Sequence, residues 1–262
     1  MERLLAAYRV EIKKHFRQRS AYLSFLFTGL AFLANAILFP VTADGVSDYE
    51  FVVQATAAVL NWIVPILVLL FGAQLISSEI STGVIRMVLA RPIRRDEYIL
   101  AKLAMAFTYA LFVSLWGILL TWGFVFVKGD AAGVIYGGEV LFTNLDMLFD
   151  YGIGFVSYLL TLLTFCAYGL LFSVMVRNPG LSSAVALGVW LTLDATKYAF
   201  GFDKYLFSTY VGQSWDVFVQ QMHGIESEWF PEIIYHVVTC VSSLFLFVSM
   251  TLVLFRRKDL HV

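Results

Sequence analysis

The sequence predicts an all-α integral membrane protein that crosses the bilayer six times. Hydrophobic residues make up 60% of the 262 positions and charged residues only 14%, and the mean hydropathy is +0.80. A spanning helix needs roughly 20 apolar residues, and the chain holds several runs of about that length. These runs are continuous rather than alternating, which favours helices over the strands of a barrel. A helix also satisfies its own backbone polar groups within lipid.

Six apolar stretches carry this prediction. The second and third are long enough to tilt or to extend beyond the bilayer. No linker, repeat or shift of composition divides the chain, so we expect one transmembrane domain over residues 1–262. The stretches cover residues 22–40, 51–77, 99–127, 151–176, 181–200 and 233–255.

The N-terminal segment, residues 1–20, is amphipathic. Leu5 and Ile12 fall on one side of a helix, whereas Arg9 and Lys13 fall on the other. This pattern is typical of a helix that lies in the membrane interface. A cleaved signal peptide is the competing interpretation, but the basic region is long and no small-residue cleavage site follows the apolar stretch. We therefore expect the segment to be retained.

Basic residues predict the orientation. The chain has 18 Lys and Arg residues, and all but Lys128, Lys197 and Lys204 lie in the N-terminal segment, beside the gaps after the second and fourth stretches, or in the C-terminal tail. The positive-inside rule assigns these regions to the cytoplasm. With an even number of spans, both ends of the chain are expected there.

The gap after the second stretch, residues 78–97, has a pattern of its own. Residues 79–90 can form a short helix with Ile85 and Leu89 on an apolar face and Glu79, Gly83 and Arg86 on another. Pro92 cannot continue a helix. An apolar face in the cytoplasm needs a protein partner or the membrane surface to cover it. On composition alone, a basic loop that only sets topology explains the segment equally well.

The order of residues in this gap resembles the permease subunits of ABC-type exporters of the type-2 family. The similarity extends to the basic N-terminal helix, the six spans and the basic ending Phe255-Arg256-Arg257. Within the gap after the second stretch, the similarity rests on a series of residues at fixed spacing, which ends with a lysine at the start of the next span. The matching residues are Glu79, Gly83, Ile85, Arg86, Leu89, Pro92, Arg94, Arg95 and Lys102.

The resemblance implies that the membrane path and the ATPase site belong to different chains. Segment 78–97 would be a coupling helix that docks on a separate cytoplasmic ATP-binding-cassette ATPase, and residues 1–20 would be an interfacial elbow helix. A second permease chain, identical or different, would complete the path in the cytoplasmic (inner) membrane of a prokaryote. ATP and Mg would be bound by the ATPase, so no cofactor is expected here. The residues expected to serve coupling are Glu79, Gly83, Ile85, Arg86, Leu89, Pro92 and Arg94.

Several polar or aromatic residues lie in or near the spans and are candidates for the path or a gate. Asp194 and Lys197 stand three positions apart and can pair on one helix face. Intramembrane polar groups are costly and often functional, but they also bond neighbouring helices to each other, and both interpretations stay open. The candidates are Asn61, Gln74, Asp194, Lys197 and Trp215.

The outer segment, residues 201–231, predicts a short amphipathic helix. Trp215, Phe218 and Met222 recur at helical spacing, so this helix would be a lid over the exit or an aromatic anchor at the interface. His223 and Glu226 follow, but scattered ligands without a motif favour a solvated loop over a metal site. Cys166 and Cys240 sit inside apolar runs and are expected to be packing residues.

Recognisable enzyme chemistry is missing from the sequence. We find no phosphate-binding loop of the G-x-x-x-x-G-K-[ST] type, no catalytic triad and no zinc motif. The chain is therefore expected to be a transport subunit without an ATPase site of its own, with the bilayer and other proteins as partners and no nucleic acid. The alternative is a membrane anchor or scaffold for an ATPase in assembly, maturation or signalling.

Overall fold

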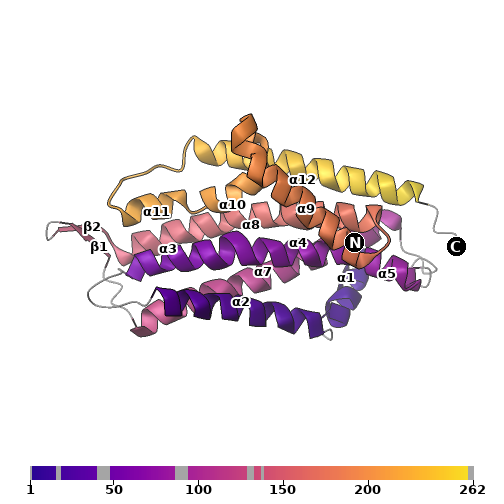
Figure 1. Cartoon of the computed structure of the whole chain (residues 1–262), viewed down its shortest axis with the longest axis horizontal. Helices are drawn as coiled ribbons and strands as arrows, with labels where there is room; N and C mark the ends of the chain where they lie inside the picture. Colours follow the sequence, from indigo (N-terminus) through magenta and orange to yellow (C-terminus); the bar gives the residue numbers. More distant parts are fainter. Residues whose placement is uncertain are drawn as a thin grey trace.

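The computed structural model describes residues 2–15, 19–39, 48–85, 94–128, 133–136 and 139–258. It is a bundle of long helices that lie side by side along the longest axis of the molecule (Figure 1). The elements are α1 (Glu2–His15), α2 (Arg19–Leu38), α3 (Asp48–Ala58), η1 (Val59–Ile63), α4 (Val64–Gln74), α5 (Ser77–Ser81), α7 (Arg95–Lys128), β1 (Val134–Tyr136), β2 (Glu139–Phe142), α8 (Asn144–Met175), α9 (Pro179–Phe200), η2 (Asp203–Tyr205), η3 (Phe207–Thr209), α10 (Tyr210–Gln213), α11 (Asp216–Met222) and α12 (Glu232–Arg257).

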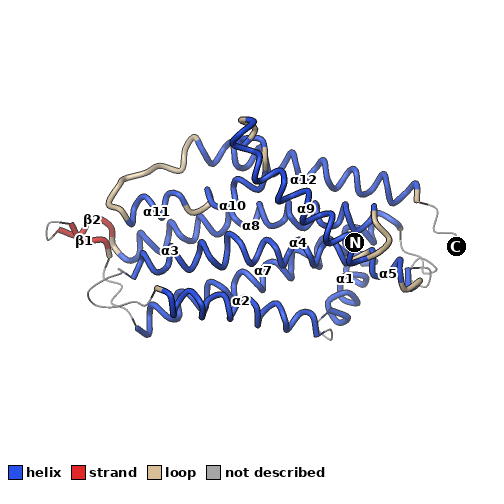
Figure 2. The backbone as a smooth tube through the Cα atoms, in the orientation of Figure 1, coloured by secondary structure: helices blue, strands red, loops and turns tan. Residues whose placement is uncertain are grey.

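The prediction of an all-helical membrane protein is confirmed at the level of long apolar helices. Within the described residues, four helical stretches are long and apolar enough to cross a membrane: Asp48–Ser81, Arg95–Lys128, Asn144–Met175 and Glu232–Arg257. The apolar part of α2, Tyr22–Leu38, is shorter. The predicted fifth stretch coincides with α9. One small element was not expected, a two-stranded antiparallel hairpin of β1 and β2, which is drawn in red in Figure 2.

Helices α4 and α8 cross closely at two glycines. A Cβ added to Gly169 would lie 2.9 Å from the Leu69 carbonyl oxygen and 3.1 Å from the Ala73 nitrogen, and one added to Gly72 would lie 3.3 Å from the Cys166 carbonyl oxygen. Small residues at such a crossing let two backbones approach and gain van der Waals contact, which drives association in lipid. This contact forms the centre of the bundle.

The second predicted span is one helical run with an irregular turn. Its middle, η1, is a π-helical turn just before Pro65, which lacks an N–H donor. The Tyr158 hydroxyl of α8 donates to the Leu60 carbonyl at 2.5 Å. A side chain from the neighbouring helix thus supplies a hydrogen bond where the regular ladder is interrupted, as helices in lipid require.

Residues 201–231, which the sequence predicts to be an outer segment, fold back onto the bundle through η2, η3, α10 and α11 (Figure 2). The predicted amphipathic helix exists as α11. Its apolar side packs inward, because Trp215 is 2% exposed and Phe218 1% exposed, and both rings contact Tyr151 of α8. This apolar side is therefore covered by the chain itself.

Candidate coupling site at one end of the bundle

One end of the bundle gathers α1, α5, the start of α7 and the end of α12, while the hairpin and α11 lie at the opposite end (Figure 1). Helix α4 stops at Gln74, and a short turn leads into α5. The amides of Ile76 and Ser77 both donate to the Ser173 hydroxyl of α8, at 2.8 and 2.9 Å. The side chain of Ser173 thus satisfies two backbone groups freed by the turn and ties α5 to α8.

The predicted continuous helix over residues 79–90 is wrong. Helix α5 ends at Ser81, and Gly83 has a φ of +72°, in the left-handed region that favours glycine. Helical backbone resumes at Val84 and Ile85. The periodic pattern continued across this break, but a helix cannot, because a left-handed residue turns the chain away from the helix axis.

Gly83 provides a direct test of this break. No heavy atom lies within 4 Å of a Cβ added there, so a substitution meets strain rather than a clash. We expect Gly83→Ala to destabilise the turn by about 1–2 kcal/mol and Gly83→Asn by much less, because asparagine tolerates the left-handed region. Faster limited proteolysis of the Ala variant alone would show this, whereas equal rates for both variants would contradict it.

Glu79 is the centre of a buried ionic network. It is 2% exposed, and Lys102 of α7 lies 2.6 Å from its Oε1. Lys14 of α1 pairs with the same oxygen, and the Tyr98 hydroxyl of α7 donates to Oε2 at 2.5 Å. One carboxylate on α5 thus holds both α1 and α7.

The network continues from Lys102 into α1. The Lys102 side chain is 0% exposed, and its ammonium also lies 2.7 Å from Glu11 Oε2. Glu11 and Glu79 are balanced by Lys102 and Lys14, which is the condition under which charges can stay buried. Imidazole Nε2 of His15 lies 3.4 Å from Glu11 Oε2. The C-terminal part of α1 thus contributes three side chains to the network, those of Glu11, Lys14 and His15.

The Glu11 carboxyl is held in its charged form. Burial pushes its pKa up, but the hydrogen bond from His15 and the nearby Lys102 charge outweigh burial and lower the pKa from 4.5 to about 2. Because the folded-state pKa is depressed, this contribution to stability is present above pH 4.5 and is lost as the pH falls toward about 2. At neutral pH the Lys102 ammonium therefore faces a carboxylate.

A second set of contacts fastens the end of α12 to the same end of the bundle. The Arg95 guanidinium donates to the carbonyl oxygens of Phe255 and Arg256 at 3.2 and 2.9 Å, where the C-terminal end of a helix leaves carbonyls without intrahelical donors. Arg256 pairs in turn with Asp96, and Lys258 donates to the Val174 carbonyl of α8. The start of α7 and the ends of α8 and α12 are thereby linked.

The remaining predicted coupling residues divide into three groups. Ile85 is buried at 3% exposure, whereas Gly83 and Arg94 are exposed. The Arg94 amide donates to the Glu97 carboxylate at 3.1 Å, which caps α7. Arg86, Leu89 and Pro92 lie outside the described residues.

The predicted path or gate residues do not meet in one place. The exposed Gln74 donates from Nε2 to the Ser183 hydroxyl of α9 at 3.1 Å. Asn61 belongs to η1, thirteen positions before Gln74 and about 20 Å away along the helix axis. Trp215 is buried against α8.

Asp194 and Lys197 do pair, as their spacing predicted. The Lys197 ammonium lies 2.7 Å from Asp194 Oδ1, and the Ser208 hydroxyl donates to the same oxygen at 2.7 Å. Lys197 is 7% exposed. The pair thus fastens the end of α9 to η3.

Sequence reasoning missed three members of the ionic network, Glu11, Lys14 and Tyr98. The sequence did contain a signal for Glu11. It is an acidic residue within a basic amphipathic segment, and His15, four positions later, shares its helix face. Its partner Lys102 is 91 positions away, and no local pattern links the two.

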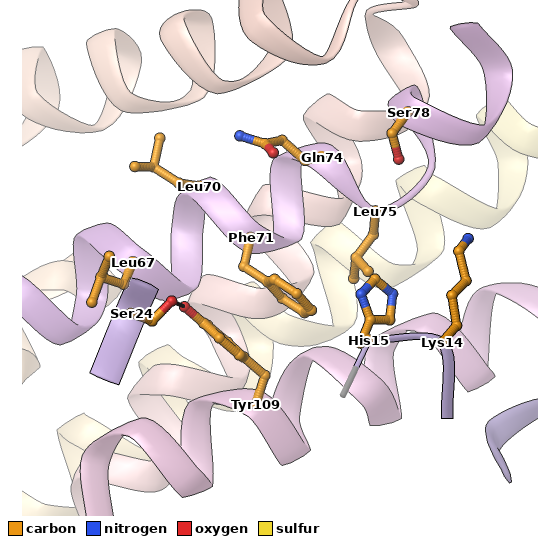
Figure 3. Close-up of a pocket in the computed structure, with 10 residues that line it drawn as sticks. All are labelled: Lys14, His15, Ser24, Leu67, Leu70, Phe71, Gln74, Leu75, Ser78 and Tyr109. Carbon is orange, nitrogen blue, oxygen red and sulfur yellow. Dashed lines mark hydrogen bonds between the residues drawn. The ribbon is translucent and has the colours of Figure 1, made fainter. Parts of the chain in front are cut away.

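A cavity of about 240 Å³ adjoins the network and lies between α1, α2, α4, α5 and α7. Figure 3 shows Lys14, His15 and Ser78 at one side of it and Leu67 and Ser24 at the other, with the rings of Phe71 and Tyr109 between them. Those two rings stack with centroids 4.0 Å apart. The cavity therefore has Lys14 and His15 at one end, and at the other end the Ser24 and Tyr109 hydroxyls bond to each other beside Leu67.

Comparison with known proteins identifies the family. A family model described as ABC-2 family transporter protein matches residues 6–200, a range that begins within α1, extends to the end of α9 and includes the whole ionic network. A search of curated proteins found no match. The resemblance drawn from residues 79–102 is confirmed by this match. The chain thus belongs to the ABC-2 transporter family, as a membrane-embedded permease component of an ABC transporter.

Proposed function

We propose that this chain is the membrane subunit of an exporter and that it receives the movement of a separate ATPase through α5 and the segment that follows. The observation that carries the proposal is the burial of Glu79, which joins α5 to α1 and α7 through Lys14, Lys102 and Tyr98. If Glu79 were exposed to solvent instead, its side chain would not join α5 to α1 and α7.

The contacts around α5 make it a rigid part of the bundle. Ser173 ties it to α8, and the Glu79 carboxylate ties it to α1 and α7. Packed cores and interfaces change between discrete arrangements rather than deforming continuously. A displacement of α5 by an ATPase would therefore move three helices together, which is what a coupling element has to do.

Buried and exposed residues of segment 78–97 serve different purposes in this proposal. Glu79 positions the segment and does not touch the ATPase, because its oxygens are occupied within the chain. The docking surface consists of the exposed turn Ser81, Thr82 and Gly83 together with Arg86, Leu89, Pro92 and Arg94. Gly83 leaves that surface open to a close backbone approach.

The full assembly has two permease chains and two ATPases in the cytoplasmic membrane of a prokaryote, with six spans per chain and both termini inside. The contacts that bring the ends of α1 and α12 to the same end of the bundle as α5 support this topology. Gln74, exposed on α4 beside α9, is the best supported of the path residues. The bonds of Asp194 and Lys197 favour a structural role for that pair.

A cysteine crosslink tests the docking surface. Cys166 and Cys240 are both buried, so a new exposed thiol reacts selectively. In native membranes, Thr82→Cys of the tagged full chain treated with a short bifunctional maleimide is expected to form an adduct with a co-purifying ABC ATPase. The matched control is Glu226→Cys, which is exposed in the loop after α11 at the other end of the bundle.

The two variants also test the orientation. A membrane-impermeant maleimide should label Glu226→Cys in intact cells and should label Thr82→Cys only after permeabilisation. An ATPase adduct at Glu226→Cys, or the absence of any ATPase from the purified membranes, would overturn the proposed function in favour of a role without coupling.

A further inference from the structure

The cavity beside the ionic network has a lining that coupling does not require. Lys14, His15 and Ser78 line one end of it, and its apolar wall consists of Leu67, Leu70 and Phe71. In Figure 3, Lys14, His15 and Ser78 lie at one end and Leu67 and Leu70 toward the other, where the hydroxyls of Ser24 and Tyr109 bond to each other. A separated lining of this kind matches a ligand that is itself amphiphilic.

The charge at the polar end favours an anion. An ammonium has three donors, and the Glu79 carboxylate takes one from Lys14. The Lys14 side chain is 36% exposed, whereas that of Glu79 is 3% exposed, so a ligand in the cavity meets the cation and not the carboxylate. Ser78 adds a neutral hydrogen-bonding group at the same end.

The size of the cavity limits what it can hold. Its volume of about 240 Å³ is smaller than the roughly 300–1,000 Å³ of sites for drug-sized ligands, so a head group and the first methylenes fit but a whole drug does not. The rest of an acyl chain can continue over the bundle surface. Leu23 and Phe27, on either side of Ser24 along α2, are 50% and 54% exposed.

We propose that this cavity binds one anionic amphiphile of the phospholipid class, with its phosphate at Lys14 and Ser78 and its chain against Leu67, Leu70 and Phe71. Because Lys14 also pairs with Glu79, a bound phosphate competes for the cation that links α1 to α5. This effect on coupling rests on the proposed function, whereas the binding itself does not, so the two can fail separately.

Native mass spectrometry of the purified full chain in a neutral detergent tests the binding. Lysophosphatidylglycerol is the probe, and glycerol phosphate is the soluble arm that has the same phosphate without a chain. We expect saturable binding of one lysophosphatidylglycerol and no comparable binding of glycerol phosphate. Lys14→Gln should weaken binding on the order of tenfold, the worth of one charged hydrogen bond.

Two further variants make the result specific. Lys13→Gln removes the same charge from an exposed neighbour on α1 and should change the affinity by less than about twofold. Leu70→Trp fills the apolar wall without touching the ion pairs and should prevent binding. Equal affinities for the two lysine variants, undiminished binding to Leu70→Trp, or glycerol phosphate binding as tightly as the lipid would each overturn the proposal.

Discussion

Lys102→Met is expected to destabilise the folded chain by about 3–5 kcal/mol, the usual cost of removing one partner from a buried ion pair. The Lys102 side chain is 0% exposed and lies between Glu11 and Glu79. Methionine keeps the length of the side chain but leaves two buried carboxylates with only Lys14 to balance them. Unfolding in mixed micelles with increasing SDS should therefore begin at a much lower SDS fraction.

Two control variants distinguish the effect of losing the buried charge from the effect of replacing a lysine side chain by methionine. Lys128→Met makes the same change at the exposed end of the same helix and should be nearly neutral. Adding Glu11→Gln to Lys102→Met leaves the single pair of Glu79 and Lys14, so the double variant should recover most of the stability. If Lys102→Met unfolded at the same SDS fraction as Lys128→Met, the buried network would not stabilise this end of the bundle.

Gly169→Leu is expected to have the second large effect, because it forces α4 and α8 apart. The added Cβ alone would lie 2.9 Å from the Leu69 carbonyl oxygen, and backbone atoms cannot move away as a flexible side chain can. Overpacking of this kind costs about 1–3 kcal/mol, and more where backbones must shift. The same SDS titration measures it.

Gly152→Leu is the matched control for that substitution. It lies on the same helix, and no heavy atom is within 4 Å of its added Cβ. Both substitutions gain the same helix propensity, so only the contact with α4 differs between them. Equal stability of the two variants would mean that α4 and α8 do not meet at Gly72 and Gly169.

Local patterns in the sequence predicted much of the fold but little of the site. Continuous apolar runs located the helices, because a membrane helix must be apolar along its whole length. The hairpin at residues 134–142 was missed, since two short strands leave no strong periodic signal. The break at Gly83 was missed for the opposite reason, since the apolar period continued across it.

The ionic network shows why the site itself was harder to predict. The motif singled out Glu79 and Lys102 as residues of one segment, but Glu11, the other partner of Lys102, lies in the first helix. Which charges pair in a bundle depends on how the helices are arranged, and periodicity within one helix carries no information about this. The spacing of Asp194 and Lys197 predicted their pair correctly because both residues lie on one helix.

The distance in sequence between Glu11 and Lys102 has a consequence for biogenesis. These partners are 91 positions apart, and at about 5–20 residues per second the ribosome takes on the order of 5–20 s to synthesise the intervening chain. Glu11 has no Lys102 during that interval, and Glu79 has none for the last 23 positions of it, so both carboxylates gain this cation only after α7 has begun to form. A nascent chain stopped before Lys102 would leave these carboxylates without that cation.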